Sequence, residues 1–206
     1  KFYTDGSLNM IIDASGQVGM GHPNPETKLD ISGVTTIRKY LLIKNEGRNI
    51  SICHDVSDNL MDGSDNIIIG DNSGNFANNQ NSIMIGHFIG ISGNDLSDNL
   101  YIGNYSSHWS GGFNNTFLGH YSGYYNGKNL STIADLKKHD NTFIGFEAGK
   151  HNGEYGGAVS SCGIENTFIG SKAGKENTSS SIIEDYGGSW NTFVGAESGM
   201  NNTTGS

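Results

Sequence analysis

The chain has 206 residues, of which 34% are hydrophobic and 31 are glycine, and its formal net charge is -9. This composition excludes a thick globular core, and the acidic balance argues against nucleic acid as a partner. No apolar run is long enough to span a membrane. Cys53 and Cys162 show neither metal-ligand spacing nor a disulfide framework. Sparse helix formers and frequent Gly and Asn favour an all-β chain of one or two domains.

Residues 1–60 differ from the rest and predict a short N-terminal β segment. Residues 10–21 indicate short strands with glycine turns, and both prolines of the chain, Pro23 and Pro25, follow them. Proline fixes φ and removes a backbone donor, so an extended connector is expected there. Alternation and β-branched residues predict two further strands, over 34–43 and 49–53. Arg38, Lys39 and Lys44 in this region form a basic cluster that is expected to be a solvated surface.

Two segments of this region resemble known proteins. Residues 16–21 are Gly-Gln-Val-Gly-Met-Gly, and residues 25–33 are Pro-Glu-Thr-Lys-Leu-Asp-Ile-Ser-Gly. This pattern is similar to a segment common in bacteriophage tail fibres and other large viral fibre proteins. Met20 and His22 stand where those proteins usually have Ile and Thr. The resemblance implies a virion-surface, extracellular location.

Residues 61–206 carry an internal repeat of the form Asn-Thr-Phe-Ile-Gly-x-x-Ala-Gly. The first glycine of each copy is Gly70, Gly86, Gly103, Gly119, Gly145, Gly170 or Gly195. Successive glycines are 16 or 17 residues apart up to Gly119 and 25 or 26 apart beyond it. A fixed period of this kind is typical of a solenoid, whose repeats contact only their neighbours and tolerate inserted loops. The sequence therefore predicts a parallel β-solenoid of about seven coils, with surface loops in the longer repeats.

Both residues before each glycine are apolar, as in Phe143 and Ile144. Adjacent strand residues point to opposite faces, so each strand is expected to be buried on both sides. One chain has a single interior, and the second face therefore calls for symmetry-related copies. We expect an intertwined or side-by-side homotrimer. The residues given a structural role in the repeat are Asn115, Phe117, Gly119, Asn141, Phe143, Gly145, Asn166, Phe168, Gly170, Asn191, Phe193 and Gly195.

The Asn-x-x-Ile-Gly element resembles the head repeats of trimeric autotransporter adhesins. The fuller Asn-Thr-Phe-Ile-Gly-x-x-Ala-Gly form resembles repeats of tail-fibre-like and large-virus surface proteins. Both resemblances imply a homotrimeric parallel β-solenoid over residues 61–206. This sequence has Phe or Tyr where the adhesin repeat has a small residue, and its coils are longer. Its end at residues 201–206 looks like the lead-in to another copy, so a fragment of a longer protein is expected.

Aromatic residues gather in or beside the inserted segments, among Asn, Asp and Ser. Such surfaces suit sugars, which offer a flat apolar face and directional hydrogen bonds. The alternative is that the rings close the loops onto the coils. The candidate glycan-binding residues are Tyr105, Trp109, Tyr124, Tyr125, Tyr155, Tyr186 and Trp190.

Other chemistry is weaker in the sequence. His87 and His120 directly follow repeat glycines and could meet a metal on a trimer axis, but the other repeats have no histidine there. Loop carboxylates could form a glycosidase pair, although no spacing marks one; they are Asp135, Asp140, Glu154, Glu184 and Asp185. Asp/Asn/Gly-rich turns at 62–66 and 71–75 lack a calcium-binding pattern. Glu147, Lys172 and Glu197 share one repeat position and fit charge alternation along a column.

The expected function is that of a structural fibre or spike segment of a virion-surface protein, with host attachment through a surface glycan. The partners are copies of the same chain and host polysaccharide or glycan, with no nucleic acid, no membrane insertion and no cofactor. The alternatives are the head of a bacterial trimeric adhesin and a polysaccharide depolymerase built on a β-solenoid. No catalytic residue is assigned.

Overall fold

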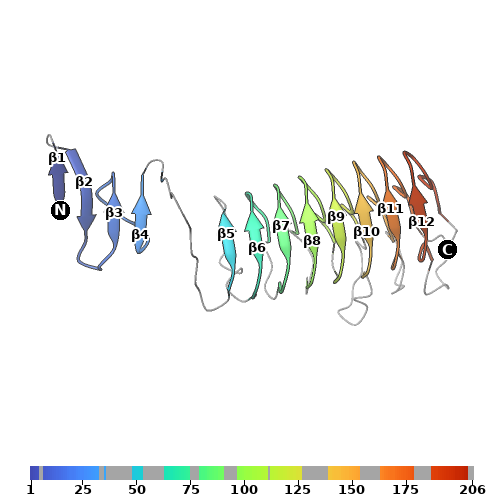
Figure 1. Cartoon of the computed structure of the whole chain (residues 1–206), viewed down its shortest axis with the longest axis horizontal. Coiled ribbons are helices and arrows are strands. Elements are labelled where there is room, and N and C mark those ends of the chain that lie inside the picture. Colours follow the sequence, from blue (N-terminus) through green and yellow to red (C-terminus); the bar gives the residue numbers. More distant parts are fainter. Residues whose placement is uncertain are drawn as a thin grey trace. The chain divides into compact units, whose positions relative to one another are not determined.

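The computed structural model describes residues 1–4, 7–32, 35, 48–52, 63–74, 79–90, 97–110, 112–126, 139–153, 163–178 and 187–203. All regular elements in these ranges are strands (Figure 1). The chain divides into two units, Lys1–Ile43 and Lys44–Ser206. Within the described ranges, no helix has the length and apolarity that crossing a membrane requires.

The first unit is a four-stranded sheet of β1 (Phe2–Thr4), β2 (Ser7–Ile12), β3 (Val18–Met20) and β4 (Leu29–Ile31) in that order. β2 pairs antiparallel with β1 and β3, and β4 pairs parallel with β3. Its buried apolar side chains among the described residues are Ile11 and Pro25. A sheet with so small a core gains little from hydrophobic burial within one copy.

The glycines of the fibre-like segment lie where the chain passes close to itself. A Cβ on Gly19 would stand 2.9 Å from the carbonyl oxygen of His22. Gly21 has φ +82°, and a Cβ there would stand 2.7 Å from the carbonyl oxygen of Ser32. The motif therefore has a steric reason, because only glycine permits both approaches.

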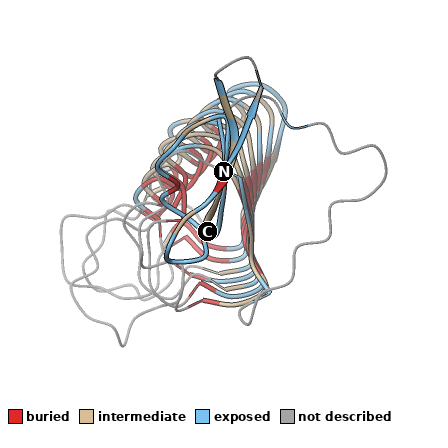
Figure 2. Cartoon of the chain, turned by 90° about the vertical axis from the view of Figure 1, so that its left-hand side faces the viewer, coloured by how far each residue is buried: buried red, intermediate tan, exposed pale blue. Residues whose placement is uncertain are grey.

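The second unit is an eight-stranded, all-parallel sheet whose strands follow chain order and pair in register. This is the arrangement of a β-solenoid, and successive strands and turns superimpose when seen along the stack (Figure 2). The strands are β5 (Ile50–Ile52), β6 (Ile67–Ile69), β7 (Ile83–Ile85), β8 (Leu100–Ile102), β9 (Thr116–Leu118), β10 (Thr142–Ile144), β11 (Thr167–Ile169) and β12 (Thr192–Val194).

The sheet begins earlier than the repeat spacing suggests. β5 pairs parallel with β6, with Ile50 opposite Ile67 and Ile52 opposite Ile69. The repeat pattern in the sequence predicts a domain boundary after residue 60, because residues 50–52 are not followed by a glycine of the repeat type. The expected strand at 49–53 is present, but it belongs to the parallel sheet rather than to the N-terminal segment. The expected strand at 34–43 lies outside the described residues, apart from Thr35.

The middle residue of each strand points inward. From β6 to β11 these side chains are completely buried: Ile68, Met84, Tyr101, Phe117, Phe143 and Phe168. The rings of Phe117 and Phe143 stack at 4.7 Å with 4° between their planes, and those of Phe143 and Phe168 at 4.9 Å with 5°. Parallel strands about 4.8 Å apart impose this ring spacing. The core therefore consists of this column together with three buried turn residues, Ile89, Ala148 and Ala173.

Each of the strands β6–β12 is followed by a glycine whose backbone conformation other residues rarely adopt. Gly145 has φ +139°, and a Cβ there would stand 2.4 Å from the carbonyl oxygen of Gly170 in the next repeat. Four residues later, Gly149 has φ +58°, and its Cβ would stand 2.5 Å from the Phe143 ring. The first glycine therefore permits close stacking of the turns, and the second leaves space for the ring.

The repeat asparagines form a ladder of hydrogen bonds. Asn141 Oδ1 accepts the backbone N–H of Asn166 at 2.9 Å, and Asn115 Oδ1 accepts that of Asn141 at 3.1 Å. Ser82 replaces asparagine at one step, and its hydroxyl accepts the Asn99 N–H at 3.2 Å. The left-handed residue is the one before each of these, such as Asp140 with φ 59°. Hydrogen bonding, rather than turn geometry, thus explains the repeat asparagine.

A second ladder runs through the later repeats only. Asn152 Nδ2 donates to Asn126 Oδ1 at 2.7 Å, and Asn177 Nδ2 donates to Asn152 Oδ1 at 2.6 Å. Asn202 Nδ2 continues it to Asn177 Oδ1 at 2.7 Å. These asparagines each stand seven residues after a repeat glycine. Because these side-chain amides hydrogen-bond to each other, they occupy the part of the interior beside the aromatic column without leaving buried polar groups unsatisfied.

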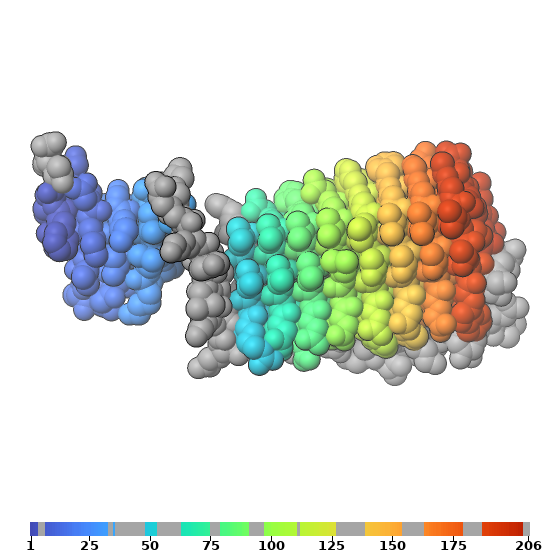
Figure 3. Space-filling model, viewed as in Figure 1, coloured from blue at the N-terminus to red at the C-terminus, as the bar shows by residue number. Residues whose placement is uncertain are grey.

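The first and third residues of each strand point outward. Five of these outward side chains are large, apolar and more than one third exposed: Ile52 at 55%, Ile83 at 37%, Ile144 at 37%, Ile169 at 38% and Val194 at 66%. None of the outward residues of β5–β12 is charged. Adjacent strand residues thus point to opposite faces, as expected, and the outward side chains of the described strands remain partly exposed in this single chain. Burial of this face by other copies stays a prediction. Figure 3 shows each strand as one band across the unit.

Candidate glycan-binding surface

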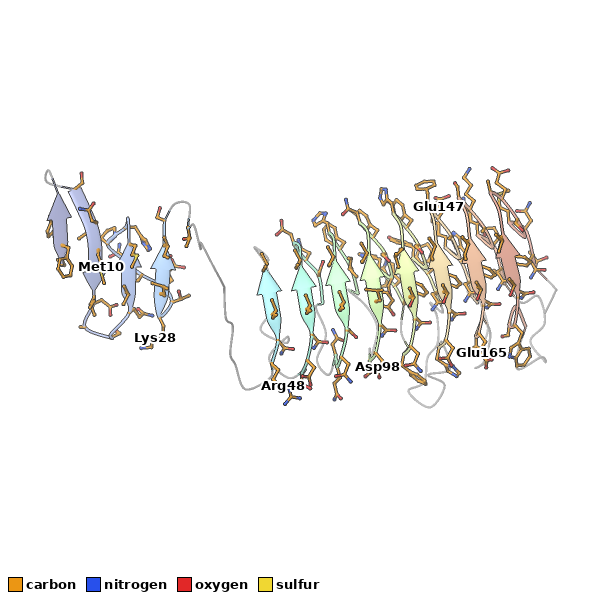
Figure 4. The ribbon with its side chains drawn as sticks, viewed as in Figure 1. Met10, Lys28, Arg48, Asp98, Glu147 and Glu165 are labelled. Carbon is orange, nitrogen blue, oxygen red and sulfur yellow. The ribbon has the colours of Figure 1, made fainter. Side chains whose placement is uncertain are left out.

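Two edges border the sheet. The exit edge comprises the turn residues that follow each repeat glycine, and the entry edge comprises the residues that precede each strand. In Figure 4, Glu147 marks the exit edge, and Asp98 and Glu165 mark the entry edge. Because repeats stack in register, each turn position forms a column of side chains along its edge.

The exit edge carries a cluster of aromatic rings, here called the aromatic block. It consists of His87, Phe88, Tyr105, His108, Trp109, His120, Tyr121, Tyr124, Tyr125 and His151. Tyr105 stacks between Phe88, at 5.2 Å, and Tyr121, at 5.1 Å. These three residues have φ between 55° and 58°, a left-handed conformation that ring stacking helps to offset.

Four of the predicted glycan-binding residues come together in this block. Tyr105 has ring neighbours on both sides, and Tyr124 stacks on His108 at 5.0 Å with 6° between the planes. Tyr125 lies against Tyr124 at 4.3 Å, with the rings nearly perpendicular. Trp109 packs edge-on against His108 and remains 40% exposed. Trp109 is therefore the most exposed ring among the four, while the three tyrosines are half-buried.

His108 is a buried member of the aromatic block. It is 9% exposed, and its Nδ1 lies 3.0 Å from the carbonyl oxygen of Phe88. Burial lowers the pKa of His108, although the Phe88 carbonyl acts in the opposite direction. The imidazole therefore remains neutral near pH 7 and packs as an aromatic ring. Burial likewise raises the pKa of Tyr124, with the neighbouring Tyr125 adding to the shift.

Charged residues continue the exit edge beyond the rings. Lys150 Nζ lies 2.8 Å from Glu147 Oε1 and 5.0 Å from the Tyr121 ring centroid, and Lys175 Nζ lies 2.9 Å from Glu147 Oε2. Partial burial favours a higher pKa for Glu147, but hydrogen bonds from the two lysines outweigh it and lower the pKa. Of the expected charge column, Lys172 approaches Glu197, at 3.9 Å. Glu147 pairs instead with Lys150 and Lys175.

The entry edge holds Trp190, apart from the aromatic block. Its column consists of left-handed residues, namely Arg48, Asp65, Asn81, Asp98, Asn114, Asp140, Glu165 and Trp190. Arg48 forms an ion pair with Asp65, and Asn81 donates to Asp98 at 3.0 Å. Trp190 is 53% exposed. The structure therefore separates the predicted aromatic residues into two surfaces.

The two histidines that directly follow repeat glycines, His87 and His120, pack against neighbouring aromatic rings. His120 stacks on Tyr121 at 4.4 Å, and His87 lies 4.1 Å from Phe88. Within the described ranges of this single chain, no group of three or more His, Cys, Asp or Glu side chains is placed to hold a metal ion. A site shared between copies remains a prediction.

Several predicted residues lie outside the described ranges. They are Tyr155, Tyr186, Cys53, Cys162, Asp135, Glu154, Glu184 and Asp185. Of the loop carboxylates considered for catalysis, Asp140 is described, and it bonds His139 Nδ1 at 2.6 Å. His139 in turn stacks on Phe113 at 4.9 Å.

Comparison with models of protein families, with curated protein sequences and with solved structures gave no match. The aromatic block itself could have been found in the sequence. Phe88, Tyr105 and Tyr121 each stand two residues after a repeat glycine, and His108 and Tyr124 stand five after one. Aligning the turns, as well as the strands, places these rings in two neighbouring columns.

Proposed function

We propose that this chain is a structural segment of a fibre or spike on a virion surface, that it assembles as a homotrimer, and that it contributes to host attachment by binding glycans. The observation that carries the proposal is an uncharged, apolar outer sheet face on an acidic chain. An exposed apolar surface of this extent marks an interaction site.

The shape of the second unit supports a mechanical role. Backbone ladders, the buried ring column and the asparagine ladder all repeat along one direction. Stability then accumulates from neighbouring repeats, so length can be added without a larger core. The N-terminal unit supports self-association independently, because Phe2, Tyr3 and Leu29 are each more than half exposed, while few of its described apolar residues are buried.

The aromatic block supports the attachment role. It combines an open Trp109 ring with tyrosine hydroxyls and a border of lysines and glutamates. Sugars pack an apolar face on such rings and hydrogen-bond to polar groups around them. Weak single sites suffice, because copies in a trimer bind a multivalent surface with avidity.

The attachment role is tested by glycan-array binding of the wild type and two tryptophan variants. Trp109→Ala removes the open ring of the aromatic block, and Trp190→Ala removes a more exposed tryptophan on the other edge. We expect saccharide binding by the wild type, at least about a tenfold loss for Trp109→Ala, and little change for Trp190→Ala. No binding by the wild type, or equal losses in both variants, would contradict attachment through the aromatic block.

A further inference from the structure

The outer sheet face changes character halfway along the stack. In β5–β8 both outward positions are apolar, whereas in β9–β12 the first outward position is always threonine. The all-apolar half comprises Ile50, Ile52, Ile67, Ile69, Ile83, Ile85, Leu100 and Ile102. The mixed half comprises Thr116, Leu118, Thr142, Ile144, Thr167, Ile169, Thr192 and Val194. One continuous face therefore has a polarity gradient along its length.

The shape of this face restricts how a second copy can cover it. Eight strands about 4.8 Å apart and three residues wide give a strip about 38 Å long and about 10 Å wide. Two such strips crossed at a right angle would share only about 100 Å², whereas aligned strips share about 400 Å², against the about 800 Å² per partner of a standard interface. Copies must therefore meet along their length.

The gradient distinguishes the two lengthwise orientations. If the copies are antiparallel, the threonines of β9–β12 face isoleucine and leucine, and each buried hydroxyl loses its hydrogen bonds to water. If the copies are parallel, the all-apolar strands β5–β8 of one copy meet those of the other, and the threonine-bearing strands β9–β12 meet each other in a part of the interface where their hydroxyls can stay hydrated. The distribution of apolar residues and threonine along the face therefore favours parallel copies, in which each half of the face contacts the same half of the other copy.

We infer that the outer face of β5–β12 is the contact between copies of this chain, parallel and in register, and that β5–β8 forms its dry core. This inference rests on the self-association in the proposed function. It adds orientation, register and the residues that carry the contact. The threonine half is the more hydrated part of the same interface.

The dry core is tested by giving early strands the threonine that later strands already carry. Ile67→Thr/Ile83→Thr/Leu100→Thr places threonine at the position that Thr116, Thr142 and Thr167 occupy in folded repeats, so the repeat fold tolerates it. We expect the dissociation constant, measured by analytical ultracentrifugation, to rise at least about tenfold. The matched control, Thr116→Ile/Thr142→Ile/Thr167→Ile, should associate as well as the wild type or better.

Orientation is tested by cysteine cross-linking in a Cys53→Ser/Cys162→Ser background. Thr192→Cys lies at one end of the face and Ile52→Cys at the other. Each variant alone should form covalent dimers on oxidation, because parallel copies bring the same residue together. When the two variants are mixed and one of them carries a size tag, oxidation should give no disulfide-linked product between a tagged and an untagged chain. Glu165→Cys, on the entry edge, controls for collisional cross-linking.

The outcomes separate the inference from the proposed function. A wild type that is monomeric at all concentrations overturns both. A wild type that associates, while the mixed cysteine variants cross-link to each other, overturns the parallel orientation and leaves self-association standing. Association that is unchanged in the triple threonine variant overturns the placement of the dry core.

Discussion

The early repeats, β5–β8, and the late repeats, β9–β12, share one backbone arrangement but differ in the side chains of the core and of the outer face. The early core column is Ile68, Met84 and Tyr101, whereas the late one is an unbroken stack of phenylalanine rings. The early outer face is apolar at both positions, and the late one alternates threonine with an aliphatic residue. The second asparagine ladder begins at Ser110, to which Asn126 donates at 3.3 Å, and runs only through the late repeats.

This difference shows what a repeat must keep and what it can change. Both halves keep the glycine that ends each strand and the side-chain oxygen that accepts the next backbone N–H. The side chain of the core column varies in size, because it is packed mainly by the same position in the neighbouring repeats. The late repeats add interior hydrogen bonds, and the early repeats add outer apolar surface.

The largest expected effect tests the shared backbone. Gly145→Ala forces a Cβ to 2.4 Å from the Gly170 carbonyl oxygen at φ +139°. We expect a loss of about 4 kcal/mol or more in the free energy of unfolding, because the clash is with backbone and cannot relax by rotamer change. Gly195→Ala is the control, since nothing lies within 4 Å of its Cβ. Urea unfolding at matched protomer concentration measures both, and equal losses would refute the stacking argument.

The core columns are compared by truncation. Phe143→Ala should cost about 3–5 kcal/mol, because it leaves a cavity between two stacked rings. Met84→Leu, in the early column, should cost less than about 1.5 kcal/mol, since the volume is nearly conserved and no ring stack is broken. Thermal and urea unfolding report both values. A Phe143→Ala variant as stable as wild type would show that the late stack does not hold the fold.

The asparagine ladder is tested at one late step. Asn141→Ala removes the acceptor for the Asn166 N–H and should cost about 1–3 kcal/mol, the penalty of an unsatisfied buried group. Asn141→Ser should cost less, because Ser82 already fills this role in an early repeat. If the serine variant is the less stable of the two, the two halves do not share one ladder.

Tyr101 marks the transition between the halves. Its hydroxyl is completely buried and, like that of Ser107, makes no hydrogen bond of good geometry, and burial raises its pKa. Ser107 stands where other repeats have glycine, and the Tyr101 and Phe117 planes differ by 24° rather than about 5°. Tyr101→Phe/Ser107→Gly restores the late pattern and should raise the free energy of unfolding by about 1 kcal/mol. A loss of stability would mean that these hydroxyls are hydrogen-bonded.

The smallest expected effect is a pH dependence at the aromatic block. The folded-state pKa of His108 lies below its ordinary value of 6.5 because burial disfavours the charged imidazole. The neutral ring thus contributes stability that is present above about pH 6.5 and is lost as the pH falls below it. His108→Phe should reduce the decline in unfolding free energy between pH 7 and pH 5, relative to wild type. An unchanged decline would assign it to other groups.

The sequence predicts much of this fold because the repeat encodes it locally. The asparagine and glycine positions indicate strand ends, and adjacent apolar residues indicate two covered faces. It does not say which of Phe143 and Ile144 points inward, because both are apolar. The second glycine of each repeat is the missing signal, since Gly149 provides space for the Phe143 ring. β5 is predicted as a strand but not as part of the repeat, because it keeps Asn49, which accepts the Asn66 N–H at 2.9 Å, but lacks the repeat glycine.

The candidate surface was only partly predictable. Single aromatic residues in turns do not reveal whether they stack on their neighbours, because stacking depends on the register of turns of unequal length. Tyr105 and Trp109 are four residues apart in sequence, yet one is enclosed between rings and the other is open. The charged residues were predicted only in part as well, since Lys172 approaches Glu197, whereas Glu147 pairs with Lys150 and Lys175 instead of Lys172.

The mass of the protein in solution, measured by light scattering over a range of concentrations, tests the central claim most directly. A mass near three times 22.0 kDa is the expected result, because it covers the uncharged apolar face of every copy. A mass of 22.0 kDa at every concentration would contradict the account, since the outer columns of the sheet would then face water.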